Sequence, residues 1–104
     1  MREILNRIAE WQGRGEAVAL ATVVKTWGSA PRPIGSKMAV SETGEMAGSV
    51  SGGCVEAAVV AQGLEILSDG TSRLLRFGVT QDEAWAVGLS CGGQIEVFVE
   101  PLEK

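Results

Sequence analysis

The two cysteines of this chain both lie in segments rich in glycine and serine. Residues 48–56 read GSVSGGCVE and residues 88–93 read GLSCGG, which places Cys54 and Cys91 beside flexible backbone. Two thiolates brought together would bind a soft metal such as Mo, Cu(I) or Zn. A closed structural zinc site needs four ligands. Cys54 and Cys91 are therefore candidate ligands of an open metal site, provided that the fold brings them together.

The segment around Cys54 falls between a predicted strand and a predicted helix. A helix N-terminus offers unpaired N–H groups, and Gly52 and Gly53 would let that backbone approach an anion closely. The hydroxyls of Ser49 and Ser51 add further donors. An ordinary tight turn with Ser51 as N-cap and a buried cysteine explains the same residues equally well.

The segment around Cys91 precedes a predicted strand. A cysteine followed by Gly92 and Gly93 suits an exposed sulfur on a flexible backbone. Taken alone, however, this motif is explained better by a glycine-rich turn with an inert thiol.

A third segment, residues 28–35, reads GSAPRPIG. Its two prolines flank Arg32 and stiffen the backbone around it. A guanidinium on a stiff loop can hold a phosphate or a carboxylate, and Lys37 could share that task. Taken alone, a surface connector with a solvated arginine is the simpler interpretation.

Composition limits the chemistry that these residues can perform. The 104 residues include no histidine and no tyrosine, so Ser-His-Asp and Cys-His catalysis are excluded. The net charge of −4 argues against a nucleic-acid partner, so an anionic ligand has to be bound locally. No apolar run reaches the roughly 20 residues that cross a bilayer, and the N-terminus has no signal-peptide pattern. We therefore expect a cytoplasmic protein with no membrane partner and with reduced thiols.

The elements that must position these segments follow from hydrophobic periodicity and turn residues. We expect one α+β domain over residues 1–104, with a mixed β-sheet of about five strands packed with two main helices. The predicted helices cover 3–12 and 55–67, and the predicted strands cover 17–24, 37–41, 46–50, 73–77 and 95–100.

Each predicted helix carries an apolar stripe. Ile4, Ile8 and Trp11 recur at helical spacing in the first, with Leu5 beside them. The second has four residues on one face, with Leu67 beside them: Val55, Val59, Gly63 and Ile66. A glycine inside a helix is unfavourable, so Gly63 predicts close packing against a neighbour. Glu56 could orient a ligand, although complementing the helix dipole is the simpler role for it.

Taken together, the three segments resemble the N-terminal domain of the XdhC/CoxI family. GSAPRPIG, GSVSGGCVE and VGLSCGG occur in the family's order, with Phe77-Gly78-Val79 and Trp85 between them. The resemblance extends from about Val18 to Pro101.

The resemblance implies a binding and insertion chaperone for the molybdenum cofactor rather than an enzyme with its own turnover. The cofactor would be molybdopterin, in the mononucleotide or the dinucleotide form, bound transiently. The implied partner is the apo-enzyme of a molybdenum hydroxylase of the xanthine or CO dehydrogenase type, and a cysteine desulfurase is a second candidate. The residues placed near the cofactor are Arg32, Ser51, Gly52, Gly53, Cys54, Cys91, Gly92 and Gly93, with the two cysteines facing the metal.

Many members of that family continue into a Rossmann-like domain, and this chain has no GxGxxG after a strand. A separate Rossmann-like chain or a homo-oligomer could then complete the site. Two other functions fit the residues: a thiol redox or sulfur-transfer protein, and a module that docks a desulfurase or an apo-enzyme without touching the cofactor. The absence of a CxxC motif weakens the redox hypothesis.

Overall fold

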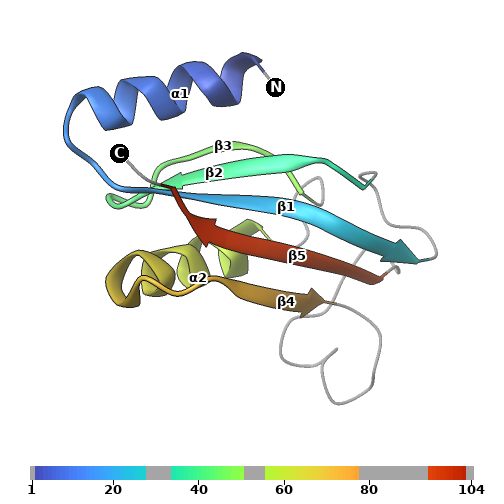
Figure 1. The fold of residues 1–104 in the computed structure, drawn as a ribbon. Coiled ribbons are helices and arrows are strands. Elements are labelled where there is room, and N and C mark those ends of the chain that lie inside the picture. Colours follow the sequence, from blue (N-terminus) through green and yellow to red (C-terminus); the bar gives the residue numbers. More distant parts are fainter. Residues whose placement is uncertain (1, 28–33, 51–55, 78–93, 103–104) are drawn as a thin grey trace.

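The structure is a computed structural model that describes residues 2–27, 34–50, 56–77 and 94–102 (Figure 1). This part of the chain forms two helices and five strands, in the order α1 (Arg2–Gly13), β1 (Val18–Trp27), β2 (Lys37–Ser41), β3 (Met46–Gly48), α2 (Glu56–Asp69), β4 (Arg73–Phe77) and β5 (Gln94–Pro101). The predicted α+β class, with two main helices and about five strands, is confirmed.

The strands form one sheet in the order β3-β2-β1-β5-β4, and each of its four strand pairs is antiparallel. The pairing thus differs from the mixed sheet that the sequence predicted. The reason is the path of α2, which carries the chain from β3 at one edge of the sheet to β4 at the opposite edge. Because β3 and β4 lie at opposite edges of the sheet, the helix that connects them does not make them a neighbouring parallel pair.

The sheet lies between the two helices, so the domain has three layers (Figure 1). Alternating residues of β1 point to opposite faces, as expected for a strand. Ala19, Ala21 and Val23 join the core under α2, whereas Val18 joins the smaller core under α1. Because both faces of β1 are covered, its sequence is a nearly continuous apolar run.

The predicted apolar stripes are largely confirmed. Ile4 and Trp11 of α1 are buried and Ile8 is half-buried, and Val59, Gly63 and Ile66 of α2 are buried. Leu5 is the exception, because its side chain is 54% exposed. It follows Ile4 by one residue, which turns it out of the stripe that faces the sheet.

Two features fix α1 against the β2–β3 hairpin. The indole Nε1 of buried Trp11 donates to Glu45 Oε2 at 2.7 Å. At the other end of the helix, Gly48 has a φ of +83°, and a Cβ there would lie 2.5 Å from the carbonyl oxygen of Lys37 and 2.6 Å from Cδ1 of Ile4. The helix therefore docks where only a glycine leaves room.

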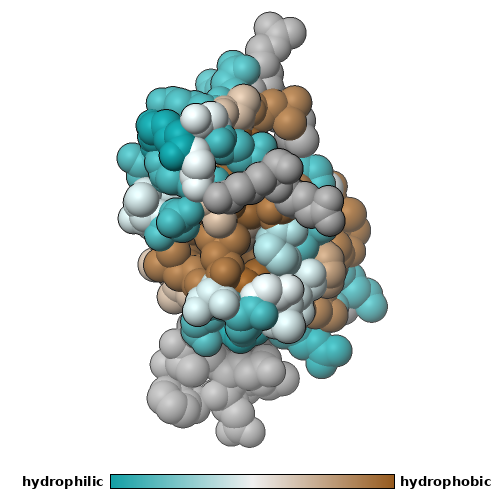
Figure 2. All heavy atoms as spheres, turned by 60° about the vertical axis from the view of Figure 1, so that its left-hand side comes forward, coloured by the Kyte–Doolittle hydropathy of each residue, from teal (hydrophilic) through white to brown (hydrophobic). Residues whose placement is uncertain are grey.

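An apolar hollow lies at the end of the sheet where both helices finish, as Figure 2 shows. Its volume is about 260 Å³, and it is lined by Ala17, Glu42, Leu64, Leu67 and Ser68. Among the described residues, neither α1 nor α2 has the length and apolar character of a bilayer-crossing helix.

Candidate functional site

The three segments that carry the predicted site residues all leave the sheet at one end. β1 ends there at Trp27, which is paired with Gln94, the first residue of β5. β4 ends there at Phe77, opposite Ile95. β2 begins and β3 ends at the same edge, where Met38 pairs with Gly48. Figure 1 shows these ends together on the side of the molecule away from the C-terminus.

The antiparallel register explains why they converge. The segment after β1 leads to the antiparallel strand β2, and the segment after β4 leads to the antiparallel strand β5. The segment after β3 leads to α2. Backbone bonds extend the β1–β2 pairing to the very start of β2: Gly35 N donates to Val23 O at 2.8 Å, and Val23 N donates to Ser36 O at 2.9 Å. The fold thus brings the attachment points of three segments that are distant in sequence to one end of the sheet.

The predicted site residues themselves lie outside the described part of the chain. These residues are Arg32, Ser51, Gly52, Gly53, Cys54, Cys91, Gly92 and Gly93. The structure places the attachment points of their segments at one end of the sheet. That these eight residues share one site stays a prediction.

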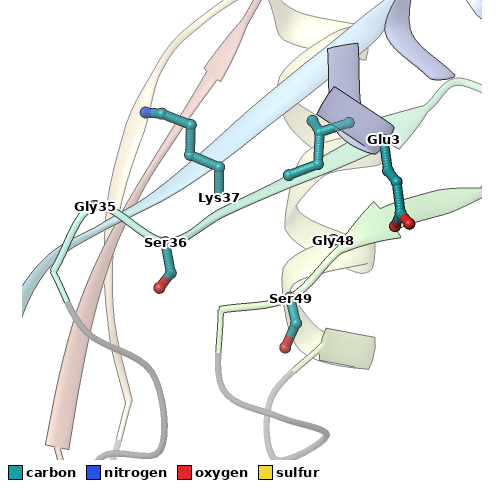
Figure 3. Close-up of a pocket in the computed structure, with 7 residues that line it drawn as sticks. Glu3, Gly35, Ser36, Lys37, Gly48 and Ser49 are labelled. Atoms are coloured by element: carbon teal, nitrogen blue, oxygen red, sulfur yellow. The ribbon is translucent and has the colours of Figure 1, made fainter. Parts of the chain in front are cut away.

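A pocket of about 640 Å³ lies among these attachment points, between the first turn of α1 and the facing ends of β2 and β3 (Figure 3). The described residues that line it are Glu3, Ile4, Gly35, Ser36, Lys37, Gly48 and Ser49. The volume falls within the range of about 300–1,000 Å³ that is typical of small-molecule sites. Most of the lining is backbone and hydroxyl groups, which can recognise a polar ligand.

Lys37 supplies the positive charge of this described lining. Its Nζ donates to Thr22 Oγ1 at 3.0 Å, and the side chain is half-buried. In Figure 3 the Lys37 side chain extends across the sheet, away from the carboxylate of Glu3. The ammonium is therefore held against the sheet by Thr22. That Lys37 assists Arg32 with an anion stays a prediction.

Sequence reasoning missed the role of Glu56 in this region. Its side chain is only 8% exposed, and Oε2 accepts bonds from Ser49 Oγ at 2.7 Å and from Val50 N at 3.1 Å. We call these two bonds the Glu56 bridge. The Ser49 hydroxyl, expected as a donor to an anion, donates to this carboxylate instead. The sequence offered only the spacing of seven residues between Ser49 and Glu56, which by itself does not identify the two as partners.

Among the described residues, no group of three or more Cys, Asp or Glu side chains is arranged to hold a metal ion. Both candidate metal ligands, Cys54 and Cys91, lie outside that part of the chain.

The α+β arrangement of this domain also occurs in a solved structure. A solved structure from Bacillus halodurans, described as a xanthine dehydrogenase, superposes with a TM-score of 0.77 at 25% identity, over 97% of this chain and 31% of that one. The sequence model of the XdhC and CoxI family matches residues 11–78. The chain belongs to the XdhC and CoxI family.

Two curated relatives cover most of the chain. The molybdenum cofactor insertion chaperone PaoD of Escherichia coli K12 is 39% identical over 99% of this chain, which is 32% of PaoD. A probable xanthine dehydrogenase subunit of Bacillus subtilis 168 is 38% identical over 86% of this chain, which is 28% of that protein. The chain thus spans about a third of the length of these relatives.

Proposed function

We propose that this domain binds the molybdenum cofactor and takes part in its insertion into a molybdenum hydroxylase of the xanthine or CO dehydrogenase type. The cofactor is cargo here, bound for transfer. Cys54 and Cys91 would contact the molybdenum, while Arg32 and the glycine-rich backbone of residues 51–53 and 92–93 would hold the phosphate end.

The observation that carries this proposal is that the strands flanking the three segments begin or finish at one end of the sheet. A ligand with a phosphate, a pterin ring and a dithiolene-bound metal needs groups of different chemistry in one place. The elements that flank the arginine segment and the two glycine-cysteine segments have their ends at one end of the sheet, next to a polar pocket of about 640 Å³, which supports the proposal that the three segments meet there.

The relatives support the choice of cargo and of recipient. One relative that matches almost the whole of this chain is named as a molybdenum cofactor insertion chaperone, and another is named as part of a probable xanthine dehydrogenase. An accessory role also agrees with composition, because a chain without histidine or tyrosine has few groups for proton transfer. We therefore propose a cytoplasmic maturation factor rather than an enzyme with its own turnover.

The proposal includes a completing partner. The described residues form one compact body, and the pocket at the end of its sheet is open to solvent. A second copy of the chain, or a Rossmann-like domain on a separate chain, would supply another wall of the site. The recipient apo-enzyme, and a cysteine desulfurase that delivers sulfur, belong to the same proposal.

The test is cofactor binding by the purified protein under anaerobic, reducing conditions, followed by absorbance and molybdenum content. We expect the wild type to bind, and we expect Cys54→Ala and Cys91→Ala each to lose binding. Arg32→Ala and Lys37→Ala should weaken binding by about tenfold each, the size expected when one charge-assisted bond is lost.

Arg14→Gln is the matched control. Arg14 is charged and exposed, and it lies just after the end of α1, at the opposite end of the sheet. Its loss should leave binding unchanged, since exposed ion pairs contribute little. Absence of binding by the wild type would contradict the proposal and would favour a docking module that does not touch the cofactor. Equal weakening by Arg14→Gln and Arg32→Ala would show that binding follows net charge alone.

A further inference from the structure

We infer that Glu56 is a positioning residue that fixes the backbone on both sides of the segment carrying Cys54. The inference rests on the proposed function, because it concerns how the same site is held ready for the cofactor. Glu56 would thus do more than complement the dipole of α2, which is the simpler role that the sequence indicates for it.

The geometry of the Glu56 bridge carries the argument. Ser49 and Val50 are the last described residues before residues 51–55, and Glu56 is the first described residue after them. One oxygen, Oε2, accepts from both the Ser49 hydroxyl and the Val50 amide. The carboxylate therefore joins the two ends of the segment directly.

The flanking contacts make both ends rigid. Ser49 N donates to Lys37 O at 3.1 Å, which continues the pairing of β3 with β2. Val50 is fully buried in the core under α2. On the other side, Glu56 opens a helix whose residues Val59 and Ile66 belong to the same core. The bridge thus connects two parts that are each already anchored.

Burial of Glu56 indicates that the bridge is more than a surface contact. Only Ser41 and Glu56 are buried polar or charged residues within the described ranges. Burying a carboxylate costs free energy unless it is hydrogen-bonded, so the bonds from Ser49 and Val50 are needed to stabilise Glu56 in its buried position. A glutamate that only complements the helix dipole would remain exposed in the first turn. This one reaches back six and seven residues instead.

The experiment compares Glu56→Ala, which removes the bridge, with Glu56→Gln, which keeps an acceptor oxygen of the same reach. Two readouts are measured: the dissociation constant for the molybdenum cofactor, and the ratio of the alkylation rates of Cys54 and Cys91 by iodoacetamide. Since these are the only two cysteines of the chain, Cys91 serves as an internal reference.

We expect Glu56→Ala to raise the dissociation constant by about tenfold and to raise the Cys54:Cys91 rate ratio by about tenfold, the order of effect expected when hydrogen bonds to a charged group are lost. Glu56→Gln should restore both readouts to within about twofold of the wild type. Glu65→Ala is the matched control, because Glu65 is an exposed carboxylate on the same helix that pairs with Arg73. It should change neither readout.

Ser49→Ala provides a second route if Glu56→Ala does not fold. It removes one of the two bonds while leaving α2 intact, and we expect changes of about threefold in the same directions. Combined with Glu56→Ala, it should add nothing, because Glu56→Ala already removes the bond that the Ser49 hydroxyl makes to the bridge.

Two results would overturn the inference. The first is an unchanged rate ratio and an unchanged affinity in both Glu56→Ala and Ser49→Ala. The second is an equal acceleration of both cysteines with a lower melting temperature, which would mean general destabilisation. If the wild type binds no cofactor, the proposed function fails, and the rate ratio alone then decides whether Glu56 positions the Cys54 segment.

Discussion

Replacing Gly63 with alanine should stabilise the protein, although this glycine lies on the buried face of α2. A Cβ built at Gly63 would be 3.5 Å from the nearest atoms of Val40 and 3.6 Å from Cβ of Ala19, which are ordinary van der Waals distances. Nothing has to move to admit the methyl group. Alanine is preferred over glycine in a helix interior by about 1 kcal/mol.

The expected gain is therefore about 1 kcal/mol, and the new buried methyl group can add up to about 0.8 kcal/mol. For a domain of this size, 1 kcal/mol corresponds to about 4–8 °C in melting temperature. Thermal unfolding followed by circular dichroism measures the shift. Ala61→Gly, at an exposed position two residues earlier in the same helix, is the reciprocal control and should lower the melting temperature by a similar amount.

A lower melting temperature for Gly63→Ala would refute the reasoning. It would mean that α2 lies closer to β1 and β2 than the structure shows, and that the glycine is required for that approach.

Three further results follow from the described contacts. Gly48→Ala should destabilise the domain by about 2 kcal/mol or more in urea unfolding, because its left-handed backbone and the close approach of α1 both oppose a Cβ; an unchanged midpoint would contradict the docking geometry. Trp11→Phe keeps most of the buried ring but removes the bond to Glu45, and should cost about 1–3 kcal/mol, with Glu45→Gln tested beside it. The pKa of the Asp69 carboxyl lies below its ordinary value of 3.8, chiefly because the Thr71 hydroxyl donates to it. Its contribution to stability is therefore full above the ordinary carboxyl range and is lost as the pH falls through the lowered pKa, and Asp69→Asn should flatten that acid limb of the pH–stability curve.

The strands and helices could be predicted well because their residues obey simple periodicities. The predicted ranges 37–41 and 73–77 coincide with β2 and β4. The strand predicted at 17–24 extends in the structure over Val18–Trp27, since a β-bulge between Val23 and Lys25 lets β1 continue past the polar residues that interrupt its apolar run. The local sequence gives no signal for such a β-bulge, so the full length of β1 could not be predicted.

The strand order could not be predicted from periodicity, because pairing depends on which edges meet. The sequence indicated a hairpin at 37–50 and a crossover helix, and both are present. It contained no signal that β5 would insert between β1 and β4. That insertion is what brings the segment before β5 to the end of the sheet where the other two segments leave.

The candidate site, like the fold, could be predicted from the sequence only in part. The three motifs could be identified by composition, and the topology supports their convergence. Glu56 was assigned only to the helix dipole, because its partners Ser49 and Val50 are recognisable as partners only once β3 and α2 are placed. Complementing the helix dipole is enough to explain a carboxylate near a helix N-terminus, so the sequence offered no reason to expect a tertiary contact of Glu56.

The central position of β1 has a consequence for synthesis of the chain. β1 is the first strand to be made, yet its most extensive pairing is with β5, the last, through partners from Trp27 with Gln94 to Ala19 with Pro101. These pairs are 67 to 82 residues apart, so the middle of the sheet closes only after residues 94–101 have left the ribosome. Until then, one edge of the most apolar strand has no partner. A chain truncated before residue 94 would leave that edge of β1 unpaired, and an unpaired strand edge is prone to pair with another chain and aggregate.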